Sequence, residues 1–180
     1  MNYDNPLLPI WEFYQITGDC LKVAQRTINR ENEYFMRDTG FIGKSIEDAT
    51  DKIVKSRRET EDYVVLSLWI AFERFMFNHV QEAGSILLEK HPLSFSQKLF
   101  DKLTDAVEYW KVEDVLDMFK NGMVSTQLIG DAKNIKKYRD WIAHKNPKKA
   151  TPSKVTPETA YKILSTLMYE IQNLFSLEKT

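Results

Sequence analysis

The sequence predicts an all-α protein, folded as an antiparallel helical bundle. Apolar residues recur at intervals of three and four along most of the chain, the spacing that places side chains on one face of a helix. Only six glycines and six prolines occur in 180 residues, and 43% of the residues are hydrophobic. No stretch alternates apolar and polar residues convincingly, as a half-buried strand does. We therefore expect a helical globular chain, most simply one domain over residues 1–180.

The first 40 residues are expected to be a helical N-terminal extension in two pieces. Apolar residues between positions 9 and 37 mostly follow helical spacings, and Thr17-Gly18-Asp19 is the expected break between the pieces. The stretch 38–43, with two glycines, is expected to be a turn. The core of the bundle is then predicted over residues 45–177.

A long central helix is predicted from a cap at Ser45 to about Lys90. Ser45 and Asp48 have the spacing of a capping box, with aspartate in place of the usual glutamate or glutamine. The second half of this helix is apolar around most of its circumference, through Val64, Val65, Leu68, Trp69, Phe72, Phe75, Met76 and Val80. Such a helix is expected to be contacted by other helices on several sides.

Two helices are predicted after the central one. His91-Pro92 ends the central helix, and Ser94 with Gln97 is a second capping-box pattern that opens a helix to about Trp110. A shorter helix over 112–120 is expected to stop at Asn121-Gly122, because glycine readily adopts a left-handed terminus.

Two more helices, joined by a loop, are predicted in the last third of the chain. The first runs from about Ser125 to Asn146-Pro147, and the three prolines between 147 and 157 indicate a loop. Thr156 is the expected cap of the final helix and Pro157 its first residue. The single cysteine, Cys20, excludes an intramolecular disulfide and fits a reducing compartment.

Several function classes are disfavoured. The chain opens without a basic leader and cleavage site, and its longest apolar run is broken by Glu73 and Arg74, so we expect a cytoplasmic protein that does not span a membrane. GFIGKS at 40–45 lacks the earlier glycine of a phosphate-binding loop, since position 38 is Asp38. No Glu-x-x-His pair of a two-metal bundle occurs, and no metal or other cofactor is expected.

Positive charge is concentrated in one stretch of the chain. Residues 133–154 contain eight lysines and arginines against one acid, Asp140, although the net charge of the whole chain is −1. A basic surface on an acidic body attracts a polyanion to one place. The alternative is a solvated, lysine-rich loop without a partner.

RDWIAH, at 139–144 within the basic stretch, contains the candidate catalytic residues. On a helical wheel His144 points away from the core side of its helix. Asp140 lies one turn before His144, where its carboxylate can accept a hydrogen bond from one ring N–H of the histidine. Arg139 and His144 diverge by about 140° on an ideal helix. Convergence on one phosphate therefore needs the reach of arginine, loosening near Pro147, or a second copy of the chain.

An arginine and a histidine without metal ligands suit one reaction well, the metal-independent cleavage of RNA. The 2′-hydroxyl attacks the adjacent phosphate, and a histidine moves the proton near neutral pH. A guanidinium binds the phosphate oxygens as charge builds on them. The candidates for steering the RNA backbone are Lys136, Lys137, Lys145, Lys148 and Lys149.

YRDWIAH near the end of a late helix, followed by a basic loop and one more helix, resembles the HEPN (higher eukaryotes and prokaryotes nucleotide-binding) superfamily. LWIAFERF in the central helix is also similar to what such domains carry. The resemblance implies a four-helix core and a homodimer with facing motifs. It also implies a metal-independent endoribonuclease of toxin–antitoxin or phage-defence systems, restrained by an antitoxin or another regulatory protein.

The resemblance assigns a role to each residue of the motif. Arg139 would bind the scissile phosphate, His144 would be the general acid or base, and Asp140 would occupy the polar position after the arginine. The family often has asparagine there, and a carboxylate either orients His144 or repels RNA. Asn146 stands where one subgroup, paired with nucleotidyltransferase antitoxins, has tyrosine. The alternative is a non-catalytic helical module for protein assembly or for binding nucleotides or RNA.

Overall fold

The computed structural model describes residues 5–30, 33–120, 122–144 and 150–177. Every regular element in these ranges is a helix, and the predicted all-α class is confirmed. The elements are α1 (Leu8–Asn29), α2 (Glu33–Met36), α3 (Ile46–Gly84), the 3-10 helix η1 (Ser85–Glu89), α4 (Leu93–Val107), α5 (Val112–Met118), α6 (Thr126–His144) and α7 (Pro157–Leu177).

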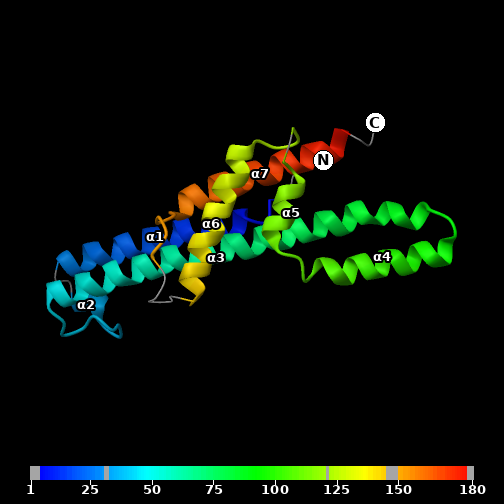
Figure 1. Ribbon diagram of the computed structural model, residues 1–180. Coiled ribbons are helices and arrows are strands. Elements are labelled where there is room, and N and C mark those ends of the chain that lie inside the picture. Colours follow the sequence, from blue (N-terminus) through cyan, green and yellow to red (C-terminus); the bar gives the residue numbers. More distant parts are fainter. Residues whose placement is uncertain (1–4, 31–32, 121, 145–149, 178–180) are drawn as a thin grey trace.

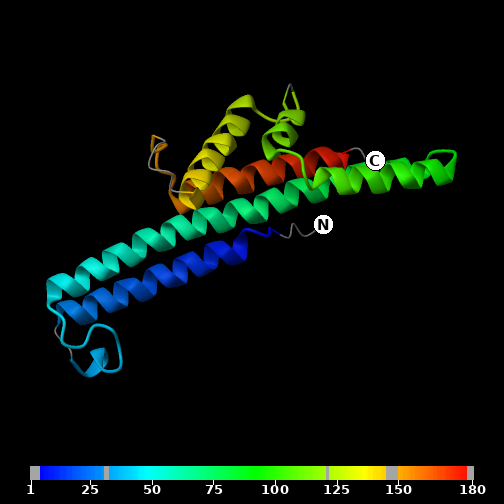
Figure 2. The same cartoon turned by 60° about the horizontal axis from the view of Figure 1, so that its bottom comes forward.

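The long helix α3 is the element on which the others pack. α1 and α6 pack against different sides of α3 (Figure 2), and α7 contacts α3, α6 and α1. The C-terminal part of α3, η1 and the returning α4 form an arm that extends beyond the rest of the molecule (Figure 1). α6 and α1 both pack against α3, but their other neighbours differ, since α6 contacts α5 and α7 while α1 contacts α2 and α7.

The main core lies where α3 meets α6 and α7. Trp69 and Phe72 of α3, Ile135 of α6, and Leu164 and Leu167 of α7 are all at most 1% exposed. Burial of each such side chain stabilises the fold by about 1.5–3 kcal/mol. A second, smaller cluster, formed by Ile28, Ala49 and Ile53, joins α1 to the start of α3.

The expected break in α1 at Thr17-Gly18-Asp19 is wrong. α1 continues through Gly18 to Asn29, because packing against α3 outweighs the roughly 1 kcal/mol by which glycine disfavours a helix interior. The chain instead leaves α1 at Arg30, and the second piece is the short α2. Residues 5–29 thus pack directly against the bundle core, and Leu7 is fully buried in it.

The N-terminal caps agree with the sequence in two of three cases, Ser45 and Thr156 but not Ser94. Ser45 caps α3, its Oγ accepting from the Asp48 N–H at 3.0 Å, and α3 gives way to η1 at Ser85. Thr156 caps α7 by accepting from Thr159 N at 3.2 Å, and α7 begins at Pro157. The capping box at Ser94 and Gln97 is wrong, because α4 already begins at Leu93 and has no side-chain cap.

No helix within the described ranges has both the length and the hydropathy needed to cross a bilayer.

Candidate functional site

The candidate catalytic residues lie on α6, and contacts with α3 fix the rotation of this helix. Its buried residues are Ile129, Ala132, Ile135, Tyr138 and Ile142. The Tyr138 hydroxyl donates to Asp62 Oδ1 of α3 at 2.8 Å. Burial and this carboxylate raise the pKa of Tyr138, so the hydroxyl keeps its proton and the bond persists at neutral pH. Arg139, the next residue, reaches Glu73 of α3.

Arg139 is partly buried between two carboxylates. Its side chain is 24% exposed, and Nη1 donates to Asp140 Oδ1 at 3.0 Å. Nη2 lies 3.8 Å from Glu73 Oε2 on α3, a loose contact. Nε is buried and has no hydrogen-bond partner among the described residues. The guanidinium is thus held in place while one of its donors stays unused.

Arg139 belongs to a row of charges that alternate in sign across three helices. Lys136 Nζ lies 2.8 Å from Glu113 Oε1 on α5 and 2.7 Å from Asp140 Oδ2. Asp140 connects Lys136 to Arg139, and Arg139 faces Glu73 on α3. Although partial burial opposes it, the hydrogen bonds from Lys136 and Arg139 lower the pKa of Asp140. This row of ion pairs joins α5, α6 and α3 around the RDWIAH motif.

His144 is the last residue of α6 and is exposed, on the outward side that the helical wheel predicts. The expected hydrogen bond between Asp140 and His144 is absent between these two described residues. The Asp140 oxygens accept instead from Arg139 and Lys136, because charged donors make stronger hydrogen bonds than a neutral imidazole. The structure thus holds Asp140 as a partner of the arginine, and the ring of His144 faces solvent.

The basic stretch is mostly paired with acids where the structure describes it. Besides Lys136 and Arg139, Lys133 lies 2.6 Å from Asp117 of α5 and Lys154 lies 2.7 Å from Glu61 of α3. Lys137 is exposed and forms no ion pair with another described residue. Lys145, Lys148 and Lys149 lie outside the described residues. Of the described lysines of the basic stretch, Lys137 is therefore the one placed to meet a polyanion.

Two residues of this site were missed in the sequence, Glu73 and Glu113. Glu73 interrupts the most apolar part of α3, and an acid within such a run is a signal for a buried partner. Glu113 gives no signal, because it lies in the first turn of α5, where acids are common at helix N-termini.

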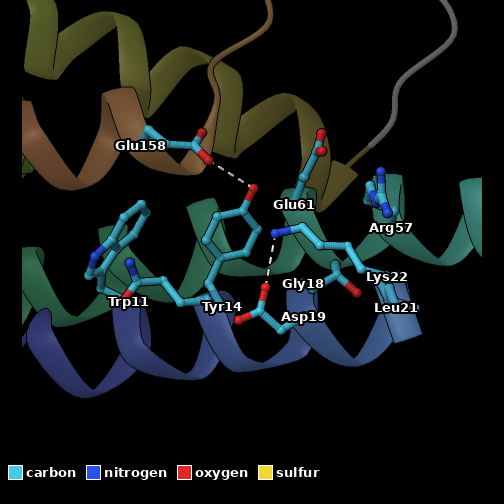
Figure 3. Close-up of a pocket in the computed structure, with 11 residues that line it drawn as sticks. Trp11, Tyr14, Gly18, Asp19, Leu21, Lys22, Arg57, Glu61 and Glu158 are labelled. Carbon is cyan, nitrogen blue, oxygen red and sulfur yellow. Dashed lines mark hydrogen bonds and ion pairs between the residues drawn. The ribbon is translucent and has the colours of Figure 1, made fainter. Parts of the chain in front are cut away.

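A pocket of about 510 Å³ lies elsewhere, between α1, α3 and the start of α7 (Figure 3). Tyr14 donates to Glu158 Oε1 at 3.0 Å and Lys22 Nζ lies 2.9 Å from Asp19 Oδ1. Burial and Glu158 raise the pKa of Tyr14 to about 12. The charged side chains of the lining carry both signs, and none of the predicted catalytic residues lines the pocket. It is therefore separate from the Arg139 site.

Comparisons of the chain with protein-family models, with curated proteins and with solved structures found no match.

Proposed function

We propose that this protein is a metal-independent endoribonuclease of the HEPN type, whose active site is composed by two copies of the chain. The observation that carries the proposal is the end of α6. There a partly buried arginine and an exposed histidine lie five residues apart. In a toxin or phage-defence setting, such an activity needs a restraining partner, for example an antitoxin that covers His144.

The reaction follows from the two side chains. One His144 removes the proton of the 2′-hydroxyl while its oxygen bonds to phosphorus, and a second His144 protonates the leaving 5′-oxygen. The products are a 2′,3′-cyclic phosphate end and a free 5′-hydroxyl. Arg139 binds the non-bridging phosphate oxygens as negative charge builds on them. A phosphate near Arg139 would displace the loose Glu73 contact more readily than the 3.0 Å ion pair with Asp140.

A second copy would bring together two groups that point apart within one chain. Arg139 turns toward Asp140 and Glu73, whereas His144 is exposed at the helix end. Two α6 ends that meet across a twofold axis supply two arginines and two histidines to one cleft. Lys137 and the nearby Lys145, Lys148 and Lys149 would attract the RNA backbone in a manner that depends on salt but little on sequence.

The experiment is incubation of the purified chain with mixed RNA in EDTA, beside His144→Ala and Arg139→Ala. Each variant should lose at least about 100-fold of the cleavage rate, the usual contribution of a placed acid or base or of a charge-stabilising donor. His91→Ala and Arg74→Ala are matched controls, because both residues are exposed and lie outside α6. Cleavage that survives His144→Ala would refute the proposal.

A second candidate, a non-catalytic helical module for protein assembly or nucleotide or RNA binding, is favoured by the ion pairs of Arg139. An arginine held by Asp140 and Glu73 is explained by packing alone. This function predicts intact RNA in the same assay. It also predicts that Arg139→Ala lowers the melting temperature while His144→Ala leaves it unchanged.

A further inference from the structure

α1 carries a row of exposed apolar side chains that the fold does not use. Phe13 is 60% exposed, Ile16 65% and Val23 60%, and Cys20 between them is also exposed. We call these four residues the α1 seam. Their spacings of three, four and three residues are those of the two core positions of a coiled-coil heptad.

The α1 seam is distinct from the face by which α1 joins the bundle. That face consists of Ile10, Tyr14, Leu21, Ala24 and Ile28, which pack against the two core clusters. On an ideal helix the centres of the two faces are roughly 110° apart. α1 therefore has two apolar faces, and a helix of this kind is expected to have a neighbour on each.

A hollow beside the α1 seam is shaped to receive an apolar side chain. It has a volume of about 180 Å³ and lies between α1 and α3, lined by Ile10, Phe13, Thr60, Tyr63, Val64 and Ser67. Tyr63, on α3, is itself 65% exposed, so the apolar surface continues from α1 onto α3. Coiled-coil contacts consist of such side chains inserted into hollows of the facing helix.

The charges beside the α1 seam favour a second copy of the chain in the antiparallel direction. Glu12, Asp19 and Arg26 occupy the same flanking position in successive heptads. In an antiparallel pair these positions face one another, so Glu12 meets Arg26 of a second copy, twice by symmetry. Asp19 then faces Asp19 of the second copy, but each of these carboxylates already pairs with Lys22 of its own chain at 2.9 Å. In a parallel pair Glu12 and Asp19 would face Thr17 and Ala24, which are uncharged. Glu12 and Arg26 form no ion pair with another described residue in the single chain.

We propose that a second copy of this chain binds along α1 in the antiparallel direction. The spacing of the α1 seam is symmetric about position 18, so Phe13 lies opposite Val23 of the second copy and Ile16 opposite its Cys20. α1 lies across α3 from α6 (Figure 2), so this pairing does not join two Arg139 sites. It is independent of the proposed ribonuclease, and a chain that uses both surfaces forms assemblies larger than a dimer.

An exchange of the two flanking charges tests the direction of the pairing. Glu12→Arg alone and Arg26→Glu alone should each raise the dissociation constant on the order of 10-fold, and the double exchange should restore it. The two residues are about 21 Å apart within one helix, so rescue requires a contact between chains. Sedimentation equilibrium gives the dissociation constants of the wild type and the three variants. If the double variant binds as weakly as the sum of the two single losses predicts, the antiparallel pairing is overturned.

Removal of the apolar contact tests the surface itself. Phe13→Glu should weaken the pairing on the order of 100-fold, because two copies of the side chain leave the interface. The helical circular dichroism should not change, since Phe13 is largely exposed in the single chain. An unchanged mass by light scattering for Phe13→Glu, or a wild-type chain that stays monomeric at about 100 µM, would overturn the proposal.

Disulfide formation gives a third readout. Under mild oxidation, Ile16→Cys should link the introduced thiol to Cys20 of the second copy, whereas the wild-type chain should stay unlinked. A wild-type dimer linked through its two Cys20 residues would mean a parallel pair and would overturn the proposal.

Discussion

α6 and α1 both pack along α3, but most charged side chains of α6 find partners within the fold, whereas a row of apolar side chains on α1 does not. α6 lies in the most basic stretch of the sequence, but Lys133, Lys136 and Arg139 all pair with acids from α5, α6 or α3. On α1, Phe13 and other apolar side chains of its seam are exposed. A run of charged residues in the sequence can thus be neutralised by ion pairs within the fold, whereas a row of apolar residues can remain exposed to solvent.

The largest change in stability is expected when a buried phenylalanine, Phe72, is replaced, in contrast to the exposed Phe13. Phe72 is fully buried on α3, so Phe72→Ala should lower the free energy of unfolding by about 3–5 kcal/mol. Phe13→Ala on α1, measured by urea unfolding at a concentration where the chain is monomeric, should change it by about 0.5 kcal/mol or less. Similar losses for both variants would mean that the α1 seam is part of the core.

Tyr138→Phe should have the next largest effect. It removes the hydrogen bond to Asp62 and leaves that carboxylate without this donor, so the free energy of unfolding should fall by about 1–2 kcal/mol. Thermal unfolding measures the loss. Tyr109→Phe is the matched control, because Tyr109 is 90% exposed and its replacement should leave the midpoint unchanged.

Gly18→Ala should stabilise the chain by about 0.5–1 kcal/mol. Position 18 is inside a continuous helix, and a Cβ there would meet no other atom within 4 Å. Alanine restricts the unfolded chain more than glycine and favours the helix. A lower melting temperature would instead support the break in α1 that the sequence predicts.

The smallest effect concerns the pH dependence of the row of charges around Arg139. Because the pKa of Asp140 is lower in the folded chain, its contribution to stability is present above the unfolded value of about 3.9 and is lost as pH falls through the folded value. The stability difference between wild type and Asp140→Asn should therefore shrink below about pH 4 in urea titrations. A difference that stays constant from pH 7 to pH 3 would contradict the ion pairs.

Local patterns in the sequence predicted much of the fold. The caps at Ser45 and Thr156 were predictable, because a cap depends on residues three positions apart. The continuity of α1 through Gly18 was not, since the packing that overrides glycine comes from α3, far away in the sequence. The cap expected at Ser94 also failed, because α4 begins at Leu93, two residues before the first helical residue that this cap would give.

By itself the sequence determined the all-α class, the central helix and the outward direction of His144, because each follows from helical periodicity. Only the tertiary structure decided which partners the charged residues have. Glu73 and Glu113 lie 66 and 26 positions before Arg139, and only the packing of α3 and α5 against α6 brings them to the motif. Likewise, the helical spacing of the α1 seam predicts a face, but the position of α3 decides that this face remains exposed.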